Sequence, residues 1–176
     1  MVQWLNNSMA QLFAVLTLFS RCAYAQTETV NKVVNGVNFN IAVFDYGIGI
    51  SDAKQTEIDT MSPSLNFFHG TNFTVLQKTN KIKAQKGLEF GINFRVSTSA
   101  DSDITITTVW VFPQPIFNAH LEKKFKELPR PLEVDNSYNG YAAYKFEQYY
   151  EMVKGEWRYQ LYYNNELLYS KSFFVE

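Results

Sequence analysis

The sequence has few of the residues that build folds held by covalent bonds or metals. It contains one cysteine and two histidines among 176 residues. A single cysteine excludes an intramolecular disulfide and a zinc site made from several thiolates. The histidines, His69 and His120, lie 51 positions apart and share no metal-ligand spacing. We therefore expect neither a metal site nor any other cofactor.

An excess of charge of either sign is also missing. Sixteen Lys and Arg oppose 17 Asp and Glu, for a formal net charge of -1. Nucleic-acid-binding domains are usually basic, so this balance argues against a nucleic-acid partner. Charged residues make up 19% of the chain and hydrophobic residues 46%. That composition excludes a disordered chain and predicts a domain with a core of its own.

Long hydrophobic runs are absent as well. The apolar run at residues 12–19 has eight residues, whereas a helix that spans a bilayer needs about 20. Ala23-Tyr24-Ala25 follows, which is typical of a secretory signal cleaved after Ala25, although no Lys or Arg precedes the run. The alternative is a buried N-terminal strand or helix. We expect a signal peptide (1–25), a flexible leader (26–36), one domain (37–176) without a transmembrane segment, and a periplasmic or secreted location.

Aromatic residues are plentiful, at 16% of the chain, and they favour strands over helices. Apolar and polar residues alternate at residues 39–43, 88–96 and 104–112, and a shorter alternation occurs at 73–75. This period of two is typical of half-buried strands. Residues 157–175 predict a hairpin around Asn164 and Asn165, since asparagine tolerates the positive φ of a tight turn.

The register of that hairpin has two solutions. A two-residue turn pairs Leu161 with Leu168, and a three-residue turn pairs Trp157 with Phe173. A β-bulge near Ser170 would reconcile the two.

Helical spacing occurs in one segment only. Phe117, Leu121, Phe125 and Leu128 would share one helix face, and prolines bracket the segment. We expect at most one short helix in the 115–130 connection. About seven strands with so little helix predict an all-β fold, an immunoglobulin-like antiparallel β-sandwich.

The most unusual feature is a cluster of five tyrosines within residues 138–150, and residues 141–150 could be strand throughout. Neighbouring residues of a strand point to opposite faces, so some of these rings should reach the surface. Exposed tyrosines favour contact with a protein or glycan partner. The alternative is a tyrosine-rich core with hydroxyls at its rim. The candidate partner-binding residues are Tyr138, Tyr141, Tyr144, Tyr149 and Tyr150.

Several motifs of the second half occur together in a specific order. They are TVWVFPQP (108–115), YNGY (138–141), GEWRYQL (155–161) and SFFV (172–175). With DYGI (45–48), they resemble the bacterial family called domain of unknown function 3859, over roughly residues 40–176. The resemblance implies a small secreted or periplasmic β-sandwich without an assigned activity, and it carries over no catalytic residues.

Motifs for catalysis are not found. Gly-x-Ser-x-Gly is absent, and the carboxylate pairs Asp101/Asp103 and Glu122/Glu127 lie in polar runs typical of solvated surface. The lysines at residues 78–86 suit a protected sheet edge or contact with an anionic surface. We predict a non-catalytic binding or interaction module. The alternatives are an envelope-associated hydrolase with an unrecognised site and a purely structural domain of an assembly.

Overall fold

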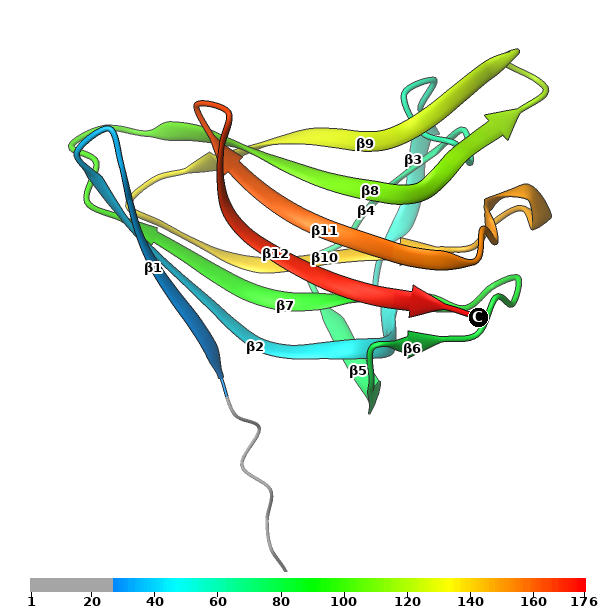
Figure 1. Cartoon of the computed structure of the whole chain (residues 1–176), viewed down its shortest axis with the longest axis horizontal. Coiled ribbons are helices and arrows are strands. Elements are labelled where there is room, and N and C mark those ends of the chain that lie inside the picture. The colour runs from blue at the N-terminus through cyan, green and yellow to red at the C-terminus, as the bar shows by residue number, and fades with distance from the viewer. Residues whose placement is uncertain (1–26) are drawn as a thin grey trace, which may run out of the picture.

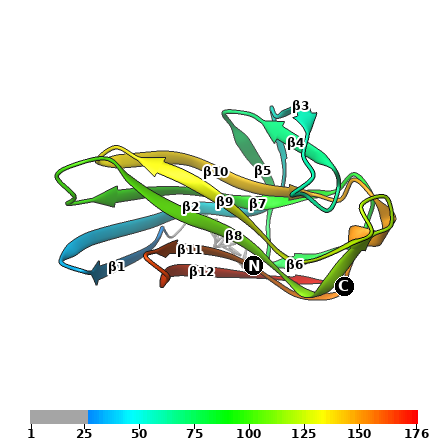
Figure 2. The same cartoon turned by 90° about the horizontal axis from the view of Figure 1, so that it is seen from above.

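The computed structural model describes residues 27–176, which form two five-stranded sheets packed face to face (Figures 1 and 2). Sheet I has the order β1-β2-β7-β10, with β5 paired to β2, and sheet II has the order β6-β12-β11-β8-β9. All pairs are antiparallel except β6 with β12. The strands of sheet I are β1 (Glu28–Val34), β2 (Val37–Ser51), β5 (Phe73–Lys78), β7 (Glu89–Thr98) and β10 (Ser137–Lys145).

Sheet II and a separate hairpin complete the fold. The strands of sheet II are β6 (Lys81–Ile82), β8 (Ile104–Asn118), β9 (Lys123–Val134), β11 (Gly155–Tyr163) and β12 (Glu166–Val175). The hairpin consists of β3 (Lys54–Ile58) and β4 (Asn66–His69), and it projects beyond sheet I in Figure 2. The antiparallel β-sandwich expected from the sequence is therefore confirmed, with more strands than the seven anticipated.

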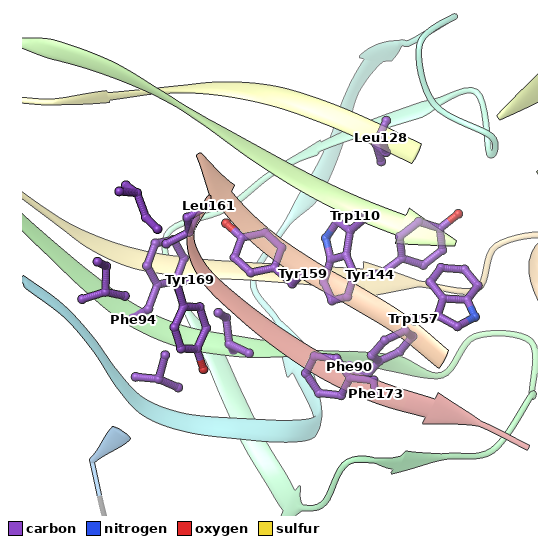
Figure 3. Packing of buried hydrophobic residues seen from close by; sticks show 14 of the residues in the cluster. Phe90, Phe94, Trp110, Leu128, Tyr144, Trp157, Tyr159, Leu161, Tyr169 and Phe173 are labelled. Atoms are coloured by element: carbon purple, nitrogen blue, oxygen red, sulfur yellow. The ribbon is translucent and has the colours of Figure 1, made fainter. Parts of the chain in front are cut away.

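Alternation along the strands builds the core. In β7 the side chains of Phe90, Ile92, Phe94 and Val96 are at most 1% exposed, whereas Arg95 between them is exposed. Phe90 lies at the centre, where its ring centroid is 5.5 Å from Trp110 and 5.2 Å from Phe173 (Figure 3). Such edge-to-face contacts add about 0.5–1.5 kcal/mol per pair beyond area burial. Trp157, expected in the core, is fully buried.

The C-terminal hairpin combines both predicted registers. Tyr163 pairs with Glu166 across a two-residue turn, while Trp157 pairs with Phe173 farther along. The register shifts between Leu161 and Tyr162, so that Leu168 is the extra residue of a bulge. The bulge that the sequence required near Ser170 is thus present two residues earlier.

The expected helix in the 115–130 connection is not formed. Strand β8 continues to Asn118, the chain turns at residues 119–122, and β9 begins at Lys123. Phe117 lies between the buried Ile116 and Asn118 on β8, so strand alternation leaves it 49% exposed, and a register shift separates Val111 from Ile116. The apolar spacing of four therefore arises from a bulge and a hairpin turn, and it does not mark a helix face.

Two further expectations need correction. Residues 28–34 of the anticipated leader form β1, which pairs with β2 through a turn at Asn35 and Gly36, both with positive φ. Its polar composition reflects its place at the edge of sheet I. The stretch 141–150 is strand only as far as Lys145 and continues into the 3-10 turn η1 (Tyr149–Glu151). The predicted signal peptide (1–25) lies outside the described residues.

Candidate binding cleft

The two open sides of the sandwich differ. On one side, β1 and β12 are bridged by Lys171, whose Nζ lies 2.9 Å from Oε2 of Glu28, and by Lys32, which donates to the carbonyl of Leu167. On the other side, β9 and β10 are joined by a short turn at residues 135–136 and diverge from it (Figure 1). That divergence leaves an opening between the sheets.

A cleft of about 870 Å³ fills this opening, and we call it the β9–β10 cleft. Its walls are the free edges of β9 and β10, its outer side is the β3–β4 hairpin, and its floor reaches the core. The hairpin contributes residues between Ile58 and Gly70. The strands contribute Phe94, Thr108, Trp110, Leu128, Arg130, Pro131, Leu132, Tyr138, residues 141–145, and Tyr159.

The floor of the cleft is aromatic. Trp110, Tyr144 and Tyr159 are at most 6% exposed, and they lie together in the core (Figure 3). Tyr138 is half-buried, and its ring centroid lies 5.7 Å from that of Phe94. Burial raises the pKa of the Tyr138 and Tyr159 hydroxyls. These hydroxyls therefore stay protonated at neutral pH, and the floor carries no charge.

The wall formed by β10 presents backbone amides. Phe146 donates to the carbonyl of Leu88, and Asn136 accepts from Thr98, so even-numbered residues bond toward β7. Alternation then directs the N–H and C=O groups of Asn139, Tyr141 and Ala143 away from β7. Because β10 is the last strand of sheet I, these groups face the cleft.

The opposite wall has a different chemistry. Strand β9 carries Pro129 and Pro131, which pair with Val109 and Thr107 of β8. Proline has no N–H to donate, so within a sheet it occupies positions whose amide would point to the free edge. The edge of β9 therefore offers carbonyl groups but lacks two of its donors.

The tip of the hairpin is fixed to sheet II through the carbonyl of Pro63. Asn118, only 1% exposed, donates to it from Nδ2 at 2.8 Å. Tyr150 donates to the same carbonyl from its hydroxyl at 3.0 Å. Asp59 also forms an ion pair with Arg130 of β9. These contacts hold the hairpin across the mouth of the cleft.

The base of the hairpin is fixed to sheet I. The Asp52 carboxylate accepts the backbone N–H groups of Thr71 and Asn72 and the Thr71 hydroxyl, at 2.7–2.9 Å. The backbone bond from Asn72 is the main cause that lowers the pKa of Asp52. Tyr141 stacks on Phe73, with ring centroids 5.9 Å apart and planes at 16°. Tyr141 thus joins β10 to the segment that follows the hairpin.

Beneath the cleft lies a buried carboxylate, Glu151, which is fully buried. Its Oε1 accepts the Tyr144 hydroxyl at 2.7 Å, and its Oε2 accepts the N–H of Gln148 at 2.6 Å. Burial raises the pKa of Glu151 to about 7, and the bond from Tyr144 opposes that rise. Glu151 does not line the cleft, because Tyr144 lies between them.

The five predicted tyrosines do not form one patch. Tyr138, Tyr141 and Tyr144 line the cleft, although Tyr144 belongs to the core. Tyr150 is 40% exposed, and its hydroxyl anchors the hairpin. Tyr149 is 74% exposed and lies under the Lys86 ammonium, 5.3 Å from the ring centroid. Both alternatives drawn from the sequence, surface and core, are thus represented in the cluster.

Other candidate residues lie outside the cleft. Asp101, Asp103, Glu122 and Glu127 are exposed, in agreement with the solvated surface expected for them. Lys81 is exposed on β6, an edge strand. His120 is exposed in the turn before β9, and the side chain of His69 is outside the described part. Within the described residues, no group of three His, Cys, Asp or Glu could hold a metal ion.

Sequence reasoning missed the hairpin, Asn118 and Glu151. The signal for one wall was present in Pro129-Arg130-Pro131, which marks an edge strand once the segment is read as β. Glu151 follows two tyrosines in an aromatic stretch and has no local pattern that predicts burial. Within residues 27–176, no helix is long and apolar enough to cross a bilayer.

Comparison with known proteins agrees with this fold. An immunoglobulin-like protein from Pseudomonas aeruginosa (PA1606) is similar, with a TM-score of 0.54 and 22% identity over 88% of this chain and 99% of that one. The alkylpurine DNA glycosylase AlkC of Pseudomonas fluorescens, bound to DNA containing an abasic site analogue, matches at a TM-score of 0.36 and 10% identity. That match covers 55% of this chain and 28% of AlkC, and it is too weak to inform fold or function.

No curated protein matches the chain significantly. A family model matches residues 38–175, which include all strands after β1 except the first residue of β2. The resemblance inferred from the sequence motifs is thereby confirmed, and the protein belongs to the family described as Domain of unknown function (DUF3859).

Proposed function

We propose that this protein is a non-catalytic binding module of the bacterial periplasm whose protein or glycan partner occupies the β9–β10 cleft. The observation that carries the proposal is the cleft itself. Its volume of about 870 Å³ falls in the usual range for ligand pockets, roughly 300–1,000 Å³. It combines an aromatic floor with a polar rim at Asp59, Ser64 and Asn66. Such a combination provides both burial and orientation for a ligand.

The chemistry of the walls supports binding over catalysis. Catalytic clefts contain titratable groups whose pKa values are shifted toward their task. In this cleft, Asp59 is paired with Arg130, and Lys145 lies 3.1 Å from the carboxylate of Glu147. Glu151 has a pKa near 7, but Tyr144 separates it from the cleft. A bound ligand would therefore meet an uncharged floor and no prepared acid or base.

The periplasmic location is proposed from the N-terminal sequence. The apolar run at residues 12–19 and Ala23-Tyr24-Ala25 support export with cleavage after Ala25. The intact mass of the protein recovered from the periplasm should correspond to a chain that begins at Gln26. A full-length product in the cytoplasm would contradict this part of the proposal.

The binding role can be tested by nuclear magnetic resonance of the isotope-labelled protein. Three probe classes would be added in turn: a pool of heptapeptides, peptidoglycan-derived oligosaccharides, and fatty acids. At least one class should shift the amide signals of residues 141–145, Arg130 and Leu132, which line the cleft. If no class perturbs these signals, the proposal is wrong.

A matched pair of variants separates the cleft from the rest of the tyrosine cluster. Tyr138→Ser removes a ring from the cleft, whereas Tyr149→Ser removes an exposed ring outside it. The first should weaken probe binding at least tenfold, and the second should change it less than twofold. Equal effects of the two variants would contradict a site in the cleft.

A further inference from the structure

The free edge of β10 defines what the cleft can hold. Its outward N–H and C=O groups, on Asn139, Tyr141 and Ala143, repeat at the spacing of a strand. A row of this kind is complemented by the backbone of another extended chain. We infer that the ligand of the β9–β10 cleft is an extended peptide segment that adds to sheet I as a strand beside β10. This inference rests on the proposed role of the cleft as a binding site.

Small side chains make this edge approachable. Gly140, Ala142 and Ala143 occupy the middle of β10, and five consecutive residues, 141–145, line the cleft. Odd- and even-numbered residues point to opposite faces of a strand, so both can line one cleft only if the cleft runs along the edge of the strand. The cleft is therefore parallel to the strand that would bind in it.

Edge protection is also weak at this strand. Native edge strands are commonly protected from pairing by lysines or prolines. Residues 138–144 contain no Lys, Arg or Pro, whereas β9 carries Lys123, Lys124, Lys126, Pro129, Arg130 and Pro131. Of the two edges that bound the cleft, β9 thus has the usual protection and β10 has none over this stretch. An incoming strand would pair with β10 and meet β9 through side chains.

Alternation specifies the side chains of the peptide. Every second residue of an added strand would point between the sheets, toward Trp110, Tyr138 and Tyr159. The other residues would face the hairpin, where Ser64 and Asn66 line the cleft. The outward backbone groups span residues 139–143 of β10. Because each strand residue extends about 3.4 Å in both chains, the expected ligand is a segment of about five residues with apolar side chains at alternate positions.

The same surface is less suited to a sugar. Stacking of a sugar ring requires an exposed aromatic face, but Trp110, Tyr144 and Tyr159 are at most 6% exposed. The half-buried rings are also engaged, since Tyr138 packs on Phe94 and Tyr141 stacks on Phe73. The cleft therefore offers backbone edges and the rims of rings. Binding of an oligosaccharide at the cleft is an outcome that the experiment below can distinguish.

The experiment begins with selection of heptapeptides displayed on phage against the purified protein. A selected peptide is synthesised with a fluorophore, and its affinity is measured by fluorescence anisotropy. Single N-methyl groups are then placed along its backbone. Methylation at alternate residues, those that bond to β10, should weaken binding at least tenfold, while methylation at the residues between them should change it less than threefold.

A variant of the protein tests the same bonds from the other side. Ala143→Pro removes an N–H group that points into the cleft, at an edge position where proline is tolerated. Ala143→Ser keeps this N–H and serves as the matched control. The proline variant should bind the peptide at least tenfold more weakly than the serine variant, which keeps the N–H group. If the proline variant does not fold, the N-methylated peptides still provide the test.

The outcomes separate this inference from the proposed function. Peptide binding that is insensitive to the position of N-methylation would overturn strand addition. Perturbation of the cleft by an oligosaccharide or a fatty acid, with no peptide selected, would overturn the peptide class and leave the binding module intact. Absence of binding by every probe class would contradict the proposed function itself.

Discussion

The Tyr144 hydroxyl donates to Oε1 of Glu151 at 2.7 Å, and this bond joins the floor of the cleft to a fully buried carboxylate. Glu151 also accepts the N–H of Gln148, so that both of its oxygens are satisfied. Burial nevertheless raises the pKa of Glu151 from 4.5 to about 7, because desolvation disfavours the charged form. The same burial raises the pKa of Tyr144, which keeps its hydroxyl protonated as a donor.

This arrangement predicts that stability falls as pH rises. Between pH 4.5 and about 7, the folded protein binds a proton at Glu151 that the unfolded chain has largely lost. The contribution of Glu151 is therefore most favourable below pH 4.5, declines through that interval and levels off above pH 7. The decline should reach at most about 3 kcal/mol in the free energy of unfolding, measured by urea denaturation at a series of pH values.

The control for this prediction is Glu151→Gln. Its amide can accept from Gln148 and donate to the Tyr144 hydroxyl, so the packing is kept while the titration is removed. Other groups titrate in the same pH range, and subtraction of the two stability profiles isolates Glu151. The variant should be the more stable protein at pH 8. Parallel profiles for the two proteins would contradict the prediction, because they would mean that the pKa of Glu151 is the same in the folded and the unfolded chain.

Trp157 provides a test of the core. It is fully buried, its centroid lies 4.8 Å from that of Phe112, and its Nε1 donates to the carbonyl of Val153 at 2.7 Å. Trp157→Ala should lower the free energy of unfolding by about 3–5 kcal/mol, as expected for deletion of a large buried aromatic side chain. Chemical denaturation measures the loss. An unchanged midpoint would mean that this ring does not pack between the sheets.

The fold could be predicted where local pattern and burial agree. The alternation Phe90, Ile92, Phe94 and Val96 marks β7, because every second residue packs on sheet II. The pattern failed at residues 115–130, where a bulge and a turn brought apolar residues to helical spacing. It failed also at β1, since an edge strand with one solvated face resembles a polar leader.

The site was less predictable because long-range contacts build it. Composition drew attention to the tyrosines, and Tyr138, Tyr141 and Tyr144 do line the cleft. The hairpin over the cleft depends on bonds from Asn118 and Tyr150 to Pro63, which is 55 and 87 residues away in sequence. A local periodicity in the sequence does not reveal contacts between residues so far apart in the chain. The cleft itself arises from the divergence of β9 and β10 and has no sequence signature.

The turn between β11 and β12 predicts a stabilising substitution. Asn164 and Asn165 have φ values of 48° and 66°, as a type I′ turn requires. Asparagine tolerates this conformation, but glycine at the second position adopts it without a steric cost. Asn165→Gly should raise the melting temperature, while Asn165→Ala should lower it by an amount equivalent to about 1 kcal/mol. A lower melting temperature for the glycine variant would contradict the assigned turn.

The contribution of each of the two donors that anchor the hairpin tip can be measured separately. Tyr150→Phe removes one of two bonds to the Pro63 carbonyl and also the bond that the Tyr150 hydroxyl accepts from Asn118 at 3.1 Å. It should lower stability by about 0.5–1.5 kcal/mol. Asn118→Ala should cost more, about 1–3 kcal/mol, because the buried Oδ1 of Asn118 also accepts the N–H groups of His120 and Leu121.

Hydrogen exchange shows which backbone amides lose protection in each variant. Both variants should speed exchange at residues 59–66. The double variant should speed it more than either single variant, because the carbonyl of Pro63 then loses both donors. Tyr149→Phe, in the same turn η1 but with a ring 74% exposed, is the matched control and should leave exchange unchanged. If the double variant exchanges at the rate of the unaltered protein, the hairpin is held by the ion pair between Asp59 and Arg130 and by its base at Asp52, and the tip bonds are dispensable.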